Sequence, residues 1–236
     1  MTPLHDWERL ARVQPYWAVL TDQSYRSDVM DSERLAEFYA SGVAQVKSIV
    51  EQMRVHLGAA PAGGRALDVG CGVGRLTRAM RTHADSVTGY DVSPTMLSHA
   101  RQHAISDGID YVNELPNGYF DWINSFIVFQ HIPPARGLQL LSRVLDLAAP
   151  EAFASIQITC WSDSKPLSLW LRFRRAAQIL KARLGLARAD GLLSMHAYDF
   201  GEVARVFVER GFDTLHLSHT DHGGQHGFWI YARRGQ

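Results

Sequence analysis

Cysteine, an excess of one charge and long apolar runs are all scarce in this sequence of 236 residues, and each scarcity excludes a class of protein. The two cysteines, Cys71 and Cys160, give neither a disulfide framework nor the spacing of zinc ligands. No apolar run approaches the roughly 18 residues that a membrane span needs. The 24 basic and 24 acidic residues balance, so no global field favours nucleic acid. Because Met1 to Trp7 show no secretory signal either, we expect a cytoplasmic protein without a membrane or nucleic-acid partner.

Short apolar strands alternate with amphipathic helices along most of the chain, which is typical of a parallel sheet covered by helices on both faces. The strands are predicted at 66–69, 87–90, 109–112, 121–128, 153–159, 214–218 and 228–232. A helical pattern over 31–57 precedes them, whereas residues 1–30 show no long helical pattern. Residues 161–195 interrupt the alternation and include a basic helical stretch over 167–184. This order predicts an α/β fold with one insertion.

A glycine-rich turn joins the first predicted strand directly to a helix. It reads LDVGCGVGR from Leu67 to Arg75, and glycines at alternate positions let the backbone approach a ligand where a Cβ would collide. The helix behind it would offer free N–H groups to a carboxylate. Asp91 follows Gly70 by about 20 residues, the distance at which an acid binds ribose hydroxyls in dinucleotide-binding folds. Dehydrogenases expect Gly-x-Gly-x-x-Gly, whereas this loop reads Gly-x-Gly-x-Gly, so the pattern favours a different nucleoside cofactor.

Three segments resemble motifs of the class I S-adenosylmethionine-dependent methyltransferases: ALDVGCGVGRLT the cofactor loop, GYDVSPTML the strand with the ribose acid, and FDWINSFIVFQHIPP the fourth strand. The resemblance implies a doubly wound, seven-stranded, mostly parallel sheet whose last strand is antiparallel, and S-adenosylmethionine as cofactor. It implies an N-terminal lid and helix over 1–60, a cofactor-binding domain over 61–236, and a substrate cap over 161–195. The cofactor-binding residues that it implies are Asp68, Gly70, Cys71, Gly72, Gly74, Arg75, Asp91, Val92, Met96, Ser125 and Gln130.

Histidines are the candidate catalytic residues, because an acceptor hydroxyl or ammonium must lose a proton and histidine titrates near neutral pH. We expect His131 first, at the carboxyl edge of the sheet, and then His226 and His196. The residues predicted to contact substrate are Tyr16, Trp17, Trp161, Tyr198 and His222, with an aromatic clasp on the core as the alternative for the first two. We predict no metal, since regular strands would send His216 and His219 to opposite faces.

These observations predict a methyltransferase that acts on a small molecule, with oxygen as the favoured acceptor atom. If the basic stretch binds a ligand rather than facing solvent, it favours an acidic or phosphorylated acceptor. The alternatives are an N- or C-methyltransferase, a non-methyl reaction on the same fold, and a non-catalytic subunit that binds the cofactor. The oligomeric state stays open.

Overall fold

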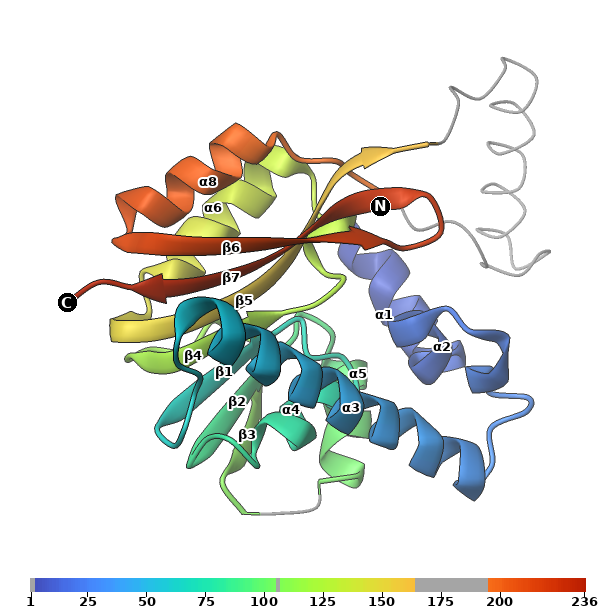
Figure 1. Cartoon of the computed structure of the whole chain (residues 1–236). Coiled ribbons are helices and arrows are strands. Elements are labelled where there is room, and N and C mark those ends of the chain that lie inside the picture. Colours follow the sequence, from blue (N-terminus) through green and yellow to red (C-terminus); the bar gives the residue numbers. More distant parts are fainter. Residues whose placement is uncertain (1–2, 105–106, 164–194) are drawn as a thin grey trace.

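A sheet with the strand order β3-β2-β1-β4-β5-β7-β6 runs through the molecule (Figure 1). The computed structural model describes residues 3–104, 107–163 and 195–236, with side chains from residue 7 onward. In that part of the chain, the sheet has seven strands. They are β1 (Arg65–Val69), β2 (Ser86–Tyr90), β3 (Ile109–Val112), β4 (Phe120–Ser125), β5 (Ala148–Ser162), β6 (Phe212–Asp221) and β7 (Gln225–Arg234). β1 to β5 pair in parallel and β7 is antiparallel to both neighbours, which confirms the predicted fold class.

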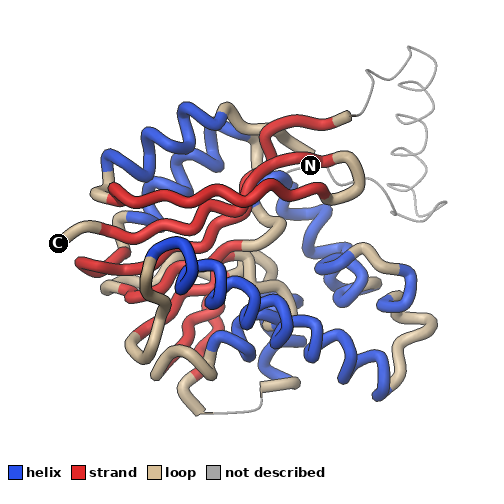
Figure 2. Tube along the Cα trace, viewed as in Figure 1, coloured by secondary structure: helices blue, strands red, loops and turns tan. Residues whose placement is uncertain are grey.

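Helices cover both faces of this sheet, as Figure 2 shows. They are α1 (Pro3–Val13), α2 (Pro15–Leu20), α3 (Ser32–Leu57), α4 (Arg75–Met80), α5 (Pro94–Gln102), α6 (Pro134–Leu145) and α8 (Phe200–Glu209). Buried side chains of α3 and α4 pack on one face, and those of α6 and α8 pack on the other. Successive side chains of β1 point to opposite faces of the sheet. Ala66 packs in the hydrophobic core on the α3 and α4 side, and Leu67 packs in the core on the α6 and α8 side. None of the described helices is long and apolar enough to cross a membrane.

Capping side chains set the beginnings of three helices. The Asp31 side chain accepts a hydrogen bond from the amide of Arg34 at α3, and Ser93 accepts one from Met96 at α5. Asp199 accepts one from the amide of Glu202 at α8. The caps predicted at Ser93 and Asp199 are therefore confirmed, and each follows a strand or loop that delivers the chain to the carboxyl edge of the sheet.

Residues 1–30 contain two short helices separated at Pro15, which agrees with the expected absence of a long helical pattern there. One predicted boundary was wrong. The fourth strand ends at Ser125 rather than at 128, since Ile127 has a φ of 58° and the chain enters the 3₁₀ helix Phe129–His131. The basic stretch over 167–184 and most of the insertion lie outside the described residues.

Candidate functional site

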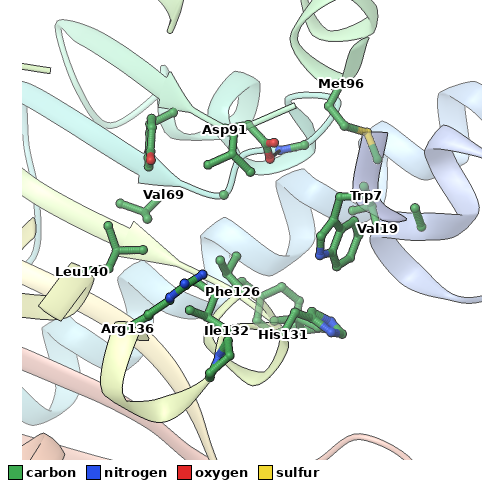
Figure 3. A pocket seen from close by; sticks show the side chains of 18 residues that line it. Trp7, Val19, Val69, Asp91, Met96, Phe126, His131, Ile132, Arg136 and Leu140 are labelled. Carbon is green, nitrogen blue, oxygen red and sulfur yellow. Dashed lines mark hydrogen bonds between the residues drawn. The ribbon is translucent and has the colours of Figure 1, made fainter. Parts of the chain in front are cut away.

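A cavity of about 510 Å³ lies at the carboxyl edge of the sheet, where β1, β2 and β4 end (Figure 3). This volume falls within the roughly 300–1,000 Å³ that is usual for ligand sites. Its walls come from five places: the α1–α2 segment, the glycine loop after β1, the end of β2 with the start of α5, the turn after β4, and the first half of α6. Most lining side chains are apolar, so the few polar ones decide what the cavity binds.

Asp91 is the carboxylate of this cavity. Its Oδ2 accepts a hydrogen bond from the amide of Gly72 at 2.9 Å, and its Oδ1 accepts one from the amide of Ser93 at 2.9 Å. Burial raises the pKa of Asp91, and the two amide bonds oppose that shift. Each carboxylate oxygen keeps a second lone pair, so the group remains able to accept from two neighbouring hydroxyls of a ligand.

The glycine loop contributes room rather than amide donors. The amides of Gly70 and Cys71 both donate to the Tyr90 carbonyl, and that of Gly72 donates to Asp91. These three loop amides are therefore bonded within the chain, while the free N–H groups were expected at the start of the following helix, α4. Gly70 and Gly72 line the cavity with φ values of 72° and 54°, a region that favours glycine. A Cβ on Gly70 would lie 2.3 Å from Cγ2 of Val128, so only glycine lets the loop approach the turn after β4.

Asp68 lies beneath the loop and outside the cavity lining. Its buried carboxylate accepts hydrogen bonds from Thr77 Oγ1 at 2.7 Å and from Asn124 Nδ2 at 2.9 Å. Asn124 in turn accepts from Ser155, which also accepts from the Trp122 indole. Burial raises the pKa of Asp68. This chain of hydrogen bonds ties β1 to β4, β5 and α4, and so it holds the loop that begins two residues later.

The other residues of the predicted cofactor set divide between the cavity and its support. Val92 and Met96 line the cavity, together with Gly70, Gly72 and Asp91. The residues that support the walls from behind are Asp68, Cys71, Gly74, Arg75, Ser125 and Gln130. Arg75 is an example: its guanidinium lies 5.7 Å from the ring centre of Phe126, which lines the cavity, and burial lowers its pKa to about 10.

Of the three predicted catalytic histidines, His131 lines the cavity. It ends the 3₁₀ helix after β4, and its ring lies edge-on to the indole of Trp7, with centroids 4.9 Å apart. His226 lies elsewhere: its Nε2 is 2.8 Å from Asp163 Oδ2, a bond that raises its pKa, and its ring stacks on Trp161. His196 touches the His131 turn through its backbone, donating its amide to the Gln130 carbonyl at 2.7 Å.

The predicted substrate residues also lie outside the lining. Tyr16 and Trp17 are buried in the cluster that attaches α2 to α3 and α5, with the Tyr16 hydroxyl 3.0 Å from His103 Nε2. These two side chains therefore pack on the core, as in the alternative of an aromatic clasp. Trp7, Ala18 and Val19 of the same segment line the cavity. His222 lies behind Phe126, which lines the cavity, and the two ring centroids are 5.6 Å apart. Burial lowers the pKa of His222.

Trp161 and Tyr198 differ in exposure. Trp161 is 43% exposed in a stack with His219 and His226, whereas Tyr198 is buried beneath the turn that carries His131. His216 packs on the other face of the sheet, against His56 of α3. The predicted opposite orientation of His216 and His219 is thus confirmed, and no three metal-ligating side chains converge among the described residues.

Two residues of the site were missed from the sequence. Arg136, in the first turn of α6, is the one arginine or lysine among the described residues that line the cavity. Glu8 of α1 accepts hydrogen bonds from the hydroxyls of Ser93, at 2.6 Å, and Thr95. Those bonds outweigh the effect of partial burial and lower the pKa of Glu8. Arg136 lies two residues beyond the motif FDWINSFIVFQHIPP, and the turn after β4 directs it toward the cavity.

Comparisons with known proteins find methyltransferases. The methyltransferase-domain family model matches residues 67–147 of this chain. A ubiquinone biosynthesis O-methyltransferase of Nitrosococcus oceani is 35% identical over 120 residues, which are 47% of this chain and 50% of that protein. One from Pseudomonas aeruginosa is 35% identical over 95 residues, 36% of this chain and 40% of that protein. The chain thus spans about half the length, or less, of these curated relatives.

Solved structures of methyltransferases share the fold along the whole chain. Magnesium protoporphyrin IX methyltransferase from Synechocystis PCC 6803 with bound S-adenosylmethionine has a TM-score of 0.63 at 14% identity, covering 100% of this chain and 98% of that one. The N-methyltransferase NodS from Bradyrhizobium japonicum WM9, with S-adenosylhomocysteine, has a TM-score of 0.58 at 12% identity, covering 98% and 100%. The fold is therefore that of the class I S-adenosylmethionine-dependent methyltransferases, as the sequence motifs predicted.

Proposed function

We propose that this protein is an S-adenosylmethionine-dependent methyltransferase that methylates a hydroxyl oxygen of a small, largely apolar acceptor. The observation that carries the proposal is the shared cavity. Asp91 follows β2 directly and His131 lies in the turn after β4, and both line the same apolar cavity at the switch point of the sheet. The names of the curated relatives, which are O-methyltransferases, support oxygen as the acceptor atom.

The residues present fit the proposed cofactor. Asp91 retains lone pairs for two ribose hydroxyls, Val92 and Met96 provide apolar contacts beside it, and Gly70 and Gly72 leave room for the aminoacyl part. When bound, S-adenosylmethionine supplies a methyl group on a sulfonium, which needs alignment with the acceptor more than activation. The protein's part is then to hold the acceptor in line and to exclude water.

The part of the cavity proposed to hold the acceptor is lined by apolar side chains and one arginine among the described residues. Phe126 is held flat against Trp229, with ring centroids 5.1 Å apart, and Trp7 closes the cavity from α1 (Figure 3). These rings suit an apolar or aromatic acceptor. Arg136 lies on the α6 side of the same cavity, so an acceptor with a carboxylate or phosphate group would find a guanidinium partner there.

His131 is the proposed general base. With S-adenosylmethionine bound as the methyl donor, the His131 ring would accept the proton that the acceptor hydroxyl must lose. Residues 1–60 would act as the lid and its supporting helix, because Trp7, Ala18 and Val19 face the cavity. Residues 161–195 would act as a cap over the substrate. A reducing, cytoplasmic setting is supported by both cysteines being free thiols.

The test is S-adenosylhomocysteine formation from S-adenosylmethionine with a panel of hydroxylated, amine and neutral aromatic small molecules. We expect turnover with hydroxylated acceptors, and the His131→Ala variant should lose about 10²- to 10⁴-fold in kcat. His196→Ala is the matched control, because that residue contacts the same turn through its backbone alone in the bonds described. Cofactor binding without turnover of any acceptor would instead indicate a non-catalytic subunit. An equal loss in both variants would exclude the base.

A further inference from the structure

The turn that carries His131 is held from beneath by Tyr198. The Tyr198 hydroxyl lies 2.9 Å from the Phe129 carbonyl and 2.8 Å from the Ile132 carbonyl, so it spans the two ends of the 3₁₀ helix. Tyr198 is 2% exposed, and burial raises its pKa, so the hydroxyl keeps its proton for donation. The one hydroxyl proton is shared between these two carbonyls, and the Phe129 carbonyl also accepts the amide of Ile132 within the turn, so Tyr198 reinforces the turn from outside it.

Gly137 shows how closely Tyr198 approaches the turn. A Cβ at Gly137 would lie 1.8 Å from the Tyr198 hydroxyl oxygen, closer than any nonbonded contact allows. Gly137 sits in a helical segment of α6 without a positive φ, so backbone freedom does not require glycine there. Space for the hydroxyl does. The sequence therefore places glycine in α6, at the expense of helix propensity, where it admits this one contact.

Thr159 of β5 anchors the same turn through two arms. Its carbonyl accepts the amide of Tyr198 at 2.8 Å, and its hydroxyl donates to Gln130 Oε1 at 2.9 Å. The other end of the Gln130 amide, Nε2, lies 3.2 Å from His131 Nε2. Thr159 is fully buried and Gln130 is 3% exposed, so water does not compete for these bonds. The first of these connections, through Tyr198, holds the backbone of the turn. The second, through Gln130, reaches the ring of His131.

We propose that Thr159, Tyr198 and Gln130 form a clamp that positions His131 in the cavity, with Tyr198 and Gln130 as positioning residues rather than groups that touch substrate or cofactor. The proposal rests on the proposed function, in which His131 acts on the acceptor. These roles differ from the substrate contact predicted for Tyr198 and the cofactor contact predicted for Gln130. Since a misplacement of about 1 Å can reduce a rate 10²-fold, loss of one arm should lower kcat by roughly 10- to 100-fold.

The test follows the His131 ring directly, by NMR in the protein with S-adenosylhomocysteine bound. The edge-on contact of His131 with Trp7 predicts cross-relaxation between the two rings in the wild type. Tyr198→Phe removes only the hydroxyl, Gln130→Ala removes the other arm, and each should weaken those cross-peaks. The matched control is Tyr39→Phe, because the Tyr39 hydroxyl also donates to a loop carbonyl, that of Val73, but outside the clamp.

The expected result is loss of the ring contact in both clamp variants, with affinity for S-adenosylhomocysteine unchanged and kcat lowered 10- to 100-fold on the acceptor found in the panel. KM for the cofactor should stay near the wild-type value. The proposal is overturned if the clamp variants keep the Trp7–His131 cross-peaks, or if Tyr39→Phe loses them equally, which would indicate general loosening. Failure of the proposed function is separate, because it would show as no cofactor binding or no turnover in the wild type.

Discussion

Replacement of Asp91 by alanine is the perturbation that most directly tests the site. In the free protein the change removes an acceptor for the amides of Gly72 and Ser93, each held at 2.9 Å. With cofactor bound, it also removes the proposed charged acceptor of two ribose hydroxyls. Asp91→Asn separates the two effects, because an amide keeps one acceptor oxygen but presents an NH₂ group to the second backbone N–H.

The expected magnitude follows from these bonds. Hydrogen bonds to a charged group contribute about 1.5–3 kcal/mol, which corresponds to roughly 10- to 150-fold in dissociation constant. Loss of the two internal amide bonds should lower the free energy of unfolding by about 1–3 kcal/mol, or Tm by roughly 2–10 °C for a chain of this length. Because burial raises the pKa of Asp91, cofactor affinity should also fall as the pH drops through that raised pKa. In Asp91→Asn this pH dependence should be absent.

The assay is calorimetric titration of wild type and variants with S-adenosylhomocysteine, over a pH range from neutral to mildly acidic. Asp121→Asn is the matched control, since the Asp121 carboxylate also accepts a backbone amide, that of Arg65, but at the amino end of β4. That variant should bind normally. Wild-type affinity in Asp91→Ala would refute the ribose assignment, and binding of NAD in place of S-adenosylhomocysteine would refute the proposed cofactor.

Three further changes test other walls of the cavity. Gly70→Ala should reduce S-adenosylhomocysteine affinity at least tenfold and lower Tm, because the added Cβ would overlap the turn after β4. The control is Gly223→Ala, which has a similar positive φ but open space around it, so it measures the backbone strain alone. Equal effects in the two variants would contradict the steric explanation. Glu8→Ala should weaken S-adenosylhomocysteine binding about two- to tenfold by freeing α1 from α5, with unchanged calorimetric affinity as the contrary result. Arg136→Gln should raise KM for an anionic acceptor about tenfold or more but leave that for a neutral analogue unchanged, whereas Arg143→Gln, farther along α6, should change neither.

The position of Asp91 could be predicted from the sequence, since it depends on local order. The strand before Asp91 is expected to pair beside the first strand, and β1 and β2 do pair from Arg65 with Ser86 to Val69 with Tyr90. Local order also gave the caps at Ser93 and Asp199, whereas the antiparallel last strand was expected from the resemblance of the motifs to a known family. The place of Asp91 and the two caps are each encoded within a short stretch by period, glycine and capping side chains.

The remaining side chains of the cavity could not be predicted, because their positions depend on chain segments that are far apart in sequence. Trp161 lies at the end of β5 and His226 at the start of β7, where they stack on each other, and Tyr198 lies beneath the turn that carries His131. Arg136 lies in an ordinary helical segment and reaches the cavity because the turn after β4 directs α6 there.

The sequence by itself determined most of the strands, the glycine loop, the place of Asp91 after the second strand and the placement of His131 at the sheet edge, because these follow from backbone conformation and local spacing. Only the tertiary structure decided that Trp7 meets His131, that Glu8 ties α1 to α5, and that Tyr198 supports the turn that carries His131. The physical reason is that each of these contacts joins residues more than 60 positions apart. Such a contact forms only once the sheet has assembled, and a single side-chain orientation then selects one partner among several within reach.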